Sequence, residues 1–124
     1  MANTILIVDD DELITKSLSL LLSNSGYKTV TASNGAEAIA TVKETSIDLI
    51  ICDVRMPELD GIETIEQIRA YLEESDKKPI PEILISGYTD EEKHKKAMSL
   101  KVVAYLLKPL DNDEFLYLVK KTIP

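Results

Sequence analysis

Several features of other protein classes are scarce or missing in this chain of 124 residues. Its one cysteine, Cys52, cannot form a disulfide within the chain, which is typical of a reducing compartment. No apolar run approaches the roughly 20 residues that a membrane-spanning helix needs. The start of the chain, MANTILIV, lacks the basic and long apolar regions of a signal peptide. We therefore expect a cytoplasmic location and no membrane association.

Positive charge is also scarce. The chain has 14 Lys and Arg against 22 Asp and Glu, which gives a formal net charge of -8. Nucleic-acid-binding domains normally carry a basic patch, so direct binding to nucleic acid is not expected, whereas binding of a cation is compatible with this charge. The motifs G-x-x-x-x-G-K-[ST] and G-x-G-x-x-G are absent, which argues against a nucleotide held in a phosphate-binding loop.

What the sequence does contain is a regular alternation of strand-like and helix-like segments. Apolar or alternating patterns predict five strands, at residues 4–9, 28–33, 47–53, 82–86 and 102–107, each followed by a helical pattern. The third, IDLIICD, is apolar enough to be buried on both faces. The alternation predicts a single α/β domain, residues 1–124, with a (βα)5 doubly wound fold and a five-stranded parallel sheet. If the strand order is 2-1-3-4-5, the carboxyl ends of the first, third, fourth and fifth strands lie side by side.

Polar residues that favour helix starts lie between these segments. Asn34 with Glu37, and Thr89 with Glu92, fit the capping-box pattern. Asp11 and Glu12 are interpreted as acids favoured in a first helical turn, Asp111 and Glu114 as the start of the last helix, and Asp60-Gly61 as a turn. The single histidine, His94, lies in a run of charged residues that is typical of a solvated helix face.

Charged and hydroxyl side chains stand at the carboxyl ends of four predicted strands: Asp9 and Asp10, Asp53, Ser86, and Lys108. Ligands of such sheets bind at this edge. Converging carboxylates repel one another unless a cation lies among them, and Mg²⁺ prefers oxygen ligands. Asp53 is a candidate metal ligand, nucleophile or both, while Lys108 and Ser86 are able to contact an anion. Together these groups predict phosphoryl transfer.

Four motifs, ILIVDDD, DVRMPELDG, ILISG and YLLKP, occur in this order between residues 4 and 122. In this respect the chain resembles the receiver domain of two-component response regulators. The resemblance implies a flavodoxin-like fold and a phosphorylation-activated signalling switch. It implies that Asp53 accepts a phosphoryl group from the phosphohistidine of a sensor histidine kinase or phosphotransfer protein. It also implies that Asp9, Asp10, Asp53 and the backbone carbonyl of Arg55 bind Mg²⁺, with Mn²⁺ as a possible substitute.

The resemblance implies further roles. Ser86 and Tyr105 would change conformation on phosphorylation, and Lys108 would pair with Asp53 and precede a cis bond to Pro109. Arg55 and Tyr88 would tune the lifetime of the phosphorylated state. The surface of the fourth helix, fifth strand and fifth helix, about residues 90–122, would shift to control an effector or partner, or to form a phosphorylation-dependent homodimer. The chemistry would be limited to self-catalysed phosphotransfer and autodephosphorylation, so no true enzyme is expected.

Two other functions share parts of this pattern. A haloacid dehalogenase-like small phosphatase would use Asp9 and Asp11 on the first strand, with Ser86 and Lys108 in later motifs. That family also needs an acidic pair on a strand after the lysine, whereas the acids after Lys108 are predicted to begin a helix. A non-phosphorylated pseudo-receiver, acting only as an interaction module, normally loses the acids, the acceptor or the lysine, and all of these are present.

Overall fold

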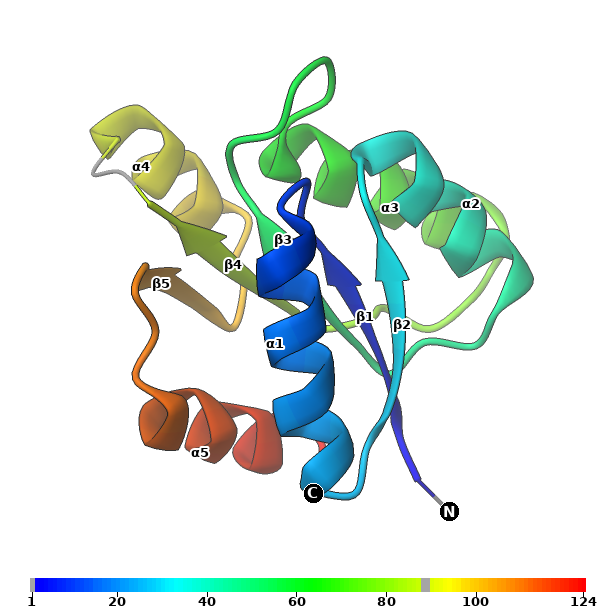
Figure 1. Cartoon of the computed structure of the whole chain (residues 1–124). Coiled ribbons are helices and arrows are strands. Elements are labelled where there is room, and N and C mark those ends of the chain that lie inside the picture. The colour runs from blue at the N-terminus through cyan, green and yellow to red at the C-terminus, as the bar shows by residue number, and fades with distance from the viewer. Residues whose placement is uncertain (1, 88–89) are drawn as a thin grey trace.

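The computed structural model describes residues 2–87 and 90–124 and has a central sheet between two layers of helices (Figure 1). The five strands are parallel, in the order β2-β1-β3-β4-β5, which confirms the predicted α/β fold. The elements in chain order are β1 Thr4–Val8, α1 Glu12–Asn24, β2 Lys28–Ala32, α2 Gly35–Glu44, β3 Leu49–Asp53, α3 Gly61–Glu74, β4 Glu82–Ser86, α4 Glu91–Ser99, β5 Ala104–Leu107 and α5 Asn112–Thr122.

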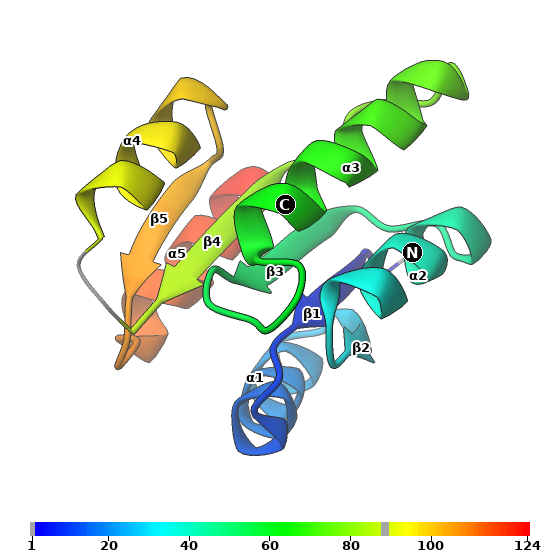
Figure 2. The same cartoon turned by 90° about the horizontal axis from the view of Figure 1, so that it is seen from above.

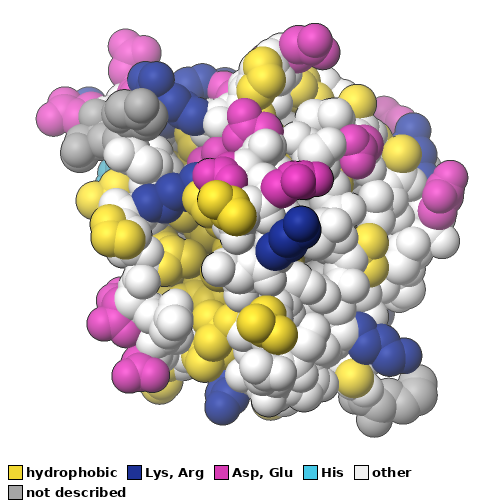
Figure 3. Space-filling model, viewed as in Figure 1, with side chains coloured by type: hydrophobic (Ala, Val, Ile, Leu, Met, Phe, Trp, Pro, Cys, Tyr) yellow, Lys and Arg dark blue, Asp and Glu magenta, His cyan; other side chains and the backbone are white. Residues whose placement is uncertain are grey.

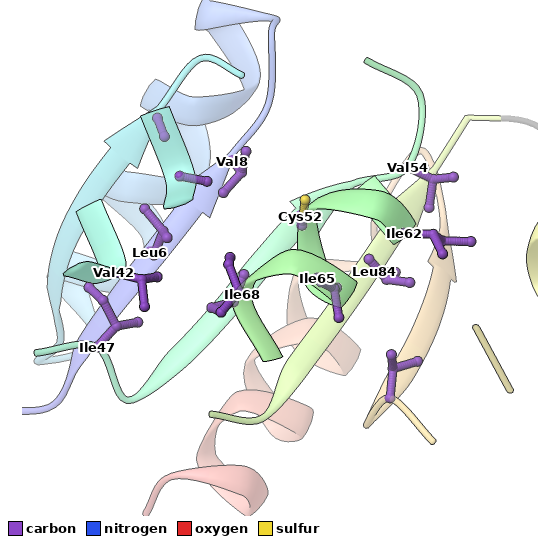
Figure 4. Close-up of a cluster of buried hydrophobic side chains, with 14 of the residues drawn as sticks. Leu6, Val8, Val42, Ile47, Cys52, Val54, Ile62, Ile65, Ile68 and Leu84 are labelled. Atoms are coloured by element: carbon purple, nitrogen blue, oxygen red, sulfur yellow. The ribbon is translucent and has the colours of Figure 1, made fainter. Parts of the chain in front are cut away.

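Each face of the sheet has its own apolar core. Figure 2 shows α1 and α5 on one face and α2, α3 and α4 on the other. Successive strand residues point to opposite faces, so Ile51 belongs to the core under α1 and α5, and Ile50 and Cys52 to the other. Figure 4 shows this second core, in which side chains of β1, β3 and β4 meet Ile62, Ile65 and Ile68 of α3. All five residues of β3 are buried, as predicted for a strand covered on both faces.

Side-chain caps begin the helices, and most of them follow the sequence pattern. Asp11 caps α1 by accepting a hydrogen bond from the N–H of Leu13, and Asp111 caps α5 by accepting from the N–H groups of Asp113 and Glu114. Asn34 caps α2 by accepting from the N–H of Glu37 (2.9 Å). The carboxylate of Glu37 in turn accepts from the backbone N–H of Ser33, one residue before the cap (3.4 Å).

Two predictions of local structure were wrong. Asp60-Gly61 is not an isolated turn: Asp60 is the N-cap of α3, in a complete capping box with Glu63. The pair Asp-Gly suits both a turn and a helix start, so the sequence did not distinguish them. The N-cap of α4 is Asp90, whose carboxylate accepts from the N–H of Lys93 (3.1 Å), rather than Thr89, which lies outside the described residues.

The fifth strand is also shorter than predicted. It begins at Ala104, because Lys101 has a left-handed backbone (φ 58°) and turns the chain just before it. The carbonyl of Glu82 still accepts a hydrogen bond from the N–H of Val103 (2.8 Å), so the chain already runs beside β4 there. Among the described residues, no helix is both long and apolar enough to cross a membrane.

Candidate functional site

The three predicted acidic residues lie together at the carboxyl ends of β1 and β3. These strands are neighbours in the sheet, with Val8 opposite Cys52, so the residues that follow, Asp9 and Asp53, emerge side by side. Carboxylate oxygens of Asp9, Asp10 and Asp53 all lie within 4.8 Å of one another. Asp9 and Asp53 are buried and Asp10 is exposed, so the cluster is open to solvent on one side. Figure 3 shows acidic side chains gathered in the upper half of the view, where the strands end.

The charges of this cluster are only partly compensated by the protein. Burial and the neighbouring Asp9 carboxylate raise the pKa of Asp53 to about 6, although Lys108 acts in the opposite direction. A divalent cation with oxygen ligands would remove this repulsion, and Mg²⁺ commonly binds through one or two carboxylates. The three carboxylates therefore fit the predicted metal. Arg55 follows two residues after Asp53 with an exposed side chain, and the role of its carbonyl stays a prediction.

Lys108 brings the positive charge of the site. Its Nζ donates to Asp9 Oδ2 (3.1 Å) and lies 3.4 Å from Asp53 Oδ1, so it contacts both buried carboxylates rather than Asp53 alone. Burial lowers the pKa of this ammonium, but Asp53 and Asp9 outweigh burial and raise it above its ordinary value. The lysine is therefore fully charged at neutral pH. The bond between Lys108 and Pro109 is cis, in agreement with the resemblance.

Ser86 ends β4 beside the acceptor strand. Ile85 lies opposite Asp53 in the register, and Ser86 is only 1% exposed. The backbone carbonyl of Ser86 accepts from the N–H of Lys108 (2.8 Å), which joins the ends of β4 and β5. The sheet therefore brings the hydroxyl, the lysine and the acids to one edge, whereas Tyr88 lies outside the described residues.

Tyr105 is the second residue of β5, three residues before Lys108, and lies on the side of the sheet covered by α4. Its hydroxyl oxygen is buried without a hydrogen-bond partner among the described residues. The ring of His94 packs edge-on against it, with 5.0 Å between ring centroids, so this exposed histidine contacts the strand as well as solvent. A buried hydroxyl without a partner is costly. Movement of Tyr105 to a position where its hydroxyl is bonded would remove this cost.

One residue that the sequence did not single out for the site is Gly61, the first residue of α3. Its N–H donates to the carbonyl of Val54 (2.9 Å), and a Cβ at this position would lie 2.2 Å from the carbonyl oxygen of Asp53. Only glycine allows α3 to begin so close to the acceptor strand. Cys52, next to Asp53, is fully buried, and burial followed by the charge of Asp53 raises the pKa of its thiol, so it is not a nucleophile.

Comparison with known proteins agrees with this geometry. The model of the response regulator receiver domain matches residues 5–120, so the chain belongs to the receiver domain family of two-component systems. Among solved structures, a response regulator receiver protein from Pseudomonas putida has a TM-score of 0.89 and 34% sequence identity, covering 98% of each chain. The chemotaxis protein CheY4 of Vibrio cholerae has a TM-score of 0.88 and 28% identity, over 99% of this chain and 100% of that one.

Several curated relatives are much longer than this chain. The transcriptional regulatory protein ZraR of Escherichia coli (strain K12) is 36% identical over 119 residues, which cover 96% of this chain and 26% of ZraR. The transcriptional regulatory protein KdpE of Mycobacterium tuberculosis (strain ATCC 25618 / H37Rv) is 32% identical over 112 residues, which cover 90% of this chain and 47% of KdpE. The chain therefore spans about a quarter of the first relatives it matches.

Proposed function

We propose that the protein is a signalling switch in which Asp53 accepts a phosphoryl group from the phosphohistidine of a sensor histidine kinase or phosphotransfer protein. The observation that carries this proposal is the grouping of three carboxylates within 4.8 Å, with the Lys108 ammonium in contact with Asp9 and Asp53. Such a site holds a carboxylate nucleophile rigidly and provides positive charge for phosphoryl oxygens. As a receiver domain it would act as a phosphoacceptor and not as a true enzyme, and we place it in the cytoplasm.

In the proposed transfer, a carboxylate oxygen of Asp53 forms a bond to phosphorus as the bond between phosphorus and the histidine nitrogen breaks. The imidazole leaves with the electron pair of the broken bond, and Asp53 becomes an acyl phosphate. Lys108 would then pair with a phosphoryl oxygen, and the Ser86 hydroxyl would donate to another. Asp9, Asp10, Asp53 and the Arg55 carbonyl would hold Mg²⁺, which supplies neutralising charge for the equatorial oxygens when bound.

The output would be a change in the surface of α4, β5 and α5. A phosphoryl group adds roughly -1.5 to -2 charges and new acceptor oxygens, and Ser86 and Tyr105 would respond to it. This surface exposes Met98, Val103 and Leu107, so it offers apolar contacts to an effector, a target or a second copy of the chain. ZraR and KdpE are transcriptional regulatory proteins, and an output in transcription, through a partner or a further domain, is compatible with this proposal.

The lifetime of the phosphorylated state is a further part of the proposal. Arg55 and Tyr88 are both bulky, and we propose that they hinder the water that would hydrolyse the acyl phosphate. Arg55 is exposed and follows Asp53 by two residues. Replacing both with alanine should shorten the phosphorylated lifetime, as measured by loss of the adduct over time. An unchanged lifetime would contradict this role.

The two alternatives fit the structure less well. The acids that follow Lys108 begin α5, with Asp111 as its N-cap, whereas a haloacid dehalogenase-like phosphatase needs its second acidic pair on a strand. A pseudo-receiver would not need three carboxylates and a lysine in contact.

Intact mass spectrometry tests the proposal. The protein is incubated with a small phosphodonor such as acetyl phosphate, with Mg²⁺ or with EDTA. We expect an adduct of one phosphoryl group in the presence of Mg²⁺, little or none with EDTA, and none in Asp53→Asn. No adduct with the small donor or with a histidine kinase would contradict the proposed function.

A further inference from the structure

Two ion pairs connect α4 to its neighbour α3. Of the nine residues of α4, Ala97 is the only one that is buried. The Lys93 ammonium pairs with the Asp60 carboxylate, and Lys96 Nζ lies 3.8 Å from Glu66 Oε2. A groove of about 330 Å³ runs between the helices and is lined by four acidic side chains, two lysines and Ile62. We call the pairs Asp60–Lys93 and Glu66–Lys96 the charge clamp.

The α3 end of this clamp is fixed to the acceptor strand. Asp60 is the N-cap of α3, and the next residue, Gly61, donates its N–H to the carbonyl of Val54 (2.9 Å). The same glycine packs so closely on Asp53 that it leaves no room for a side chain. Asp60 is thus connected to the residue directly after the acceptor by a short and rigid path.

The Asp60 carboxylate serves both helices at once. Its Oδ1 accepts from the N–H of Glu63 (2.8 Å) in α3, and its Oδ2 accepts from Lys93 in the first turn of α4. Although burial raises the pKa of Asp60, the Glu63 N–H and the Lys93 ammonium together hold it below its ordinary value. The hydrogen bond to Asp60 likewise raises the pKa of Lys93, so both partners stay charged over the physiological range.

The two pairs of the clamp are not equivalent. The side chains of Lys96 and Glu66 are 57% and 39% exposed, and pairs of this kind contribute little to stability. The Asp60 side chain is 15% exposed and already fixed by its role as a cap, so less entropy is lost when Lys93 binds it. Of the two pairs, Asp60–Lys93 therefore contributes more to the contact between the helices, although the Lys93 side chain is itself 41% exposed.

We propose that the charge clamp transmits the state of Asp53 to α4 through the loop between β3 and α3, beside the route through Ser86 and Tyr105. This proposal rests on the proposed phosphorylation of Asp53. A change at Asp53 moves or stiffens the loop that carries Asp60, and Lys93 conveys the change to the first turn of α4. Because coupling between two sites is reciprocal, a partner that moves α4 would also alter the acceptor loop.

Hydrogen–deuterium exchange of the α4 peptides, read by mass spectrometry, tests this proposal. Wild type, Lys93→Gln and Lys93→Arg are compared with Lys95→Gln, which makes the same charge change on α4 at a residue without an ion pair among the described residues. Each protein is measured at rest and with Mg²⁺ and beryllofluoride, a mimic of the phosphoryl group. Asp60→Asn, which keeps a capping oxygen and loses the charge, completes a double-mutant cycle with Lys93→Gln.

At rest, α4 should exchange about three- to fivefold faster in Lys93→Gln, as expected for loss of one partly buried ion pair. Lys93→Arg and Lys95→Gln should remain close to wild type. The change that beryllofluoride produces in α4 should fall to roughly half or less in Lys93→Gln. Asp60→Asn should reproduce both effects, and the double variant should add little to either.

Two results separate the failure of this inference from that of the proposed function. If wild type and Lys93→Gln respond equally to beryllofluoride, transmission through the charge clamp is overturned while the switch stands, whatever their resting exchange. If beryllofluoride leaves wild type unchanged, the proposed function fails and the transmission fails with it. In either case, faster resting exchange in Lys93→Gln would mean that the Asp60–Lys93 pair stabilises α4 but does not transmit the state of Asp53.

Discussion

The neighbouring helices α3 and α4 lie on the same face of the sheet and are held in opposite ways. α3 buries six residues, among them Ile62, Ile65 and Ile68, whereas α4 buries only Ala97. Full burial of one large aliphatic side chain contributes about 1.5–3 kcal/mol, whereas an exposed ion pair contributes about 0–1 kcal/mol. α3 is therefore part of the rigid scaffold, whereas α4 is able to move. Segments with few buried apolar contacts open most easily, and α4 is such a segment.

The largest expected difference between the two helices is in the cost of truncating a side chain. Ile65→Ala truncates a side chain of α3 that is 0% exposed, so we expect a loss of about 2–5 kcal/mol in the free energy of unfolding. Met98→Ala on α4 removes a side chain that is 44% exposed and should cost less than about 0.5 kcal/mol. Urea unfolding of both variants measures the difference. Similar losses in the two would contradict the assignment of α3 as scaffold.

Gly61→Ala tests how closely the scaffold approaches the acceptor. The added methyl group would lie 2.2 Å from the carbonyl oxygen of Asp53, so α3 or β3 must shift. We expect a loss of about 1–3 kcal/mol, the usual cost of overpacking, together with slower phosphorylation by the small donor. Gly87→Ala is the matched control, because its nearest contact is the Lys108 side chain at 3.9 Å. Equal stability of the two variants would show that the close approach is not required.

The raised pKa of Asp53 in the acidic cluster predicts that the free energy of unfolding depends on pH. Burial and Asp9 raise the pKa of Asp53 from 3.8 to about 6, so the folded protein ionises this group less readily than the unfolded chain does. Its ionisation therefore costs stability, fully so above pH 6, and this cost declines as the pH falls below 6 and vanishes near pH 3.8, below which Asp53 is protonated in both states. In metal-free buffer at pH 8, Asp53→Asn should be more stable than wild type by on the order of 2 kcal/mol.

Urea unfolding across the pH range checks this sign. The stability difference between Asp53→Asn and wild type should shrink towards pH 5, where Asp53 is protonated in the folded protein. Added Mg²⁺ should stabilise wild type more than the variant, because the cation offsets the same repulsion. A difference that stays constant with pH would contradict the raised pKa.

Asp60 caps α3 and pairs with Lys93 of α4, so its variants separate the contribution of the cap from that of the ion pair. Asp60→Ala removes both the cap of α3 and the partner of Lys93, and should cost about 0.5–2 kcal/mol. Asp60→Asn keeps a capping oxygen and should cost about half as much or less. The free energy of unfolding from urea titrations gives both values. If Asn and Ala are equally costly, the charge of Asp60 matters more than its role as a cap.

Salt should produce the smallest effect and should act on one helix only. Raising the ionic strength from about 0.05 M to about 0.5 M screens exposed charges, so amide exchange in α4 should rise by roughly twofold. Exchange in α3, which apolar burial holds, should stay the same. Equal acceleration in both helices would indicate general loosening rather than release of the charge clamp.

Much of the fold follows from patterns that act over short distances in the chain. The apolar runs of β1 and β3 and the helical spacing after each strand predicted the parallel sheet and the edge where Asp9 and Asp53 meet. The carboxyl ends of parallel strands lie at the same edge of a sheet, so the polar residues at the ends of four strands were expected to meet there. This part of the site was accessible from sequence because topology alone determines it.

The features that were missed depend on contacts between distant elements. The sequence shows Asp60-Gly61 as a turn-forming pair, and nothing in its neighbours reveals that Lys93 lies against Asp60. The contact of Lys108 with Asp9 depends on which of two nearby carboxylates its flexible side chain reaches. The sequence did not place the cap of α4 because Thr89 and Asp90 are both good capping residues, and the hydrogen bond from the Lys93 N–H to Asp90 identifies the cap.

The central claim, that Asp53 accepts the phosphoryl group, is tested most directly by locating the modification. The protein is phosphorylated with Mg²⁺ and acetyl phosphate, and the acyl phosphate is reduced with borohydride. Peptide mass spectrometry then identifies the reduced residue. We predict conversion of Asp53 to homoserine in wild type and no conversion anywhere in Asp53→Asn. Conversion of Asp9 or Asp10, or of no aspartate at all, would contradict the assignment of Asp53 as the phosphoacceptor.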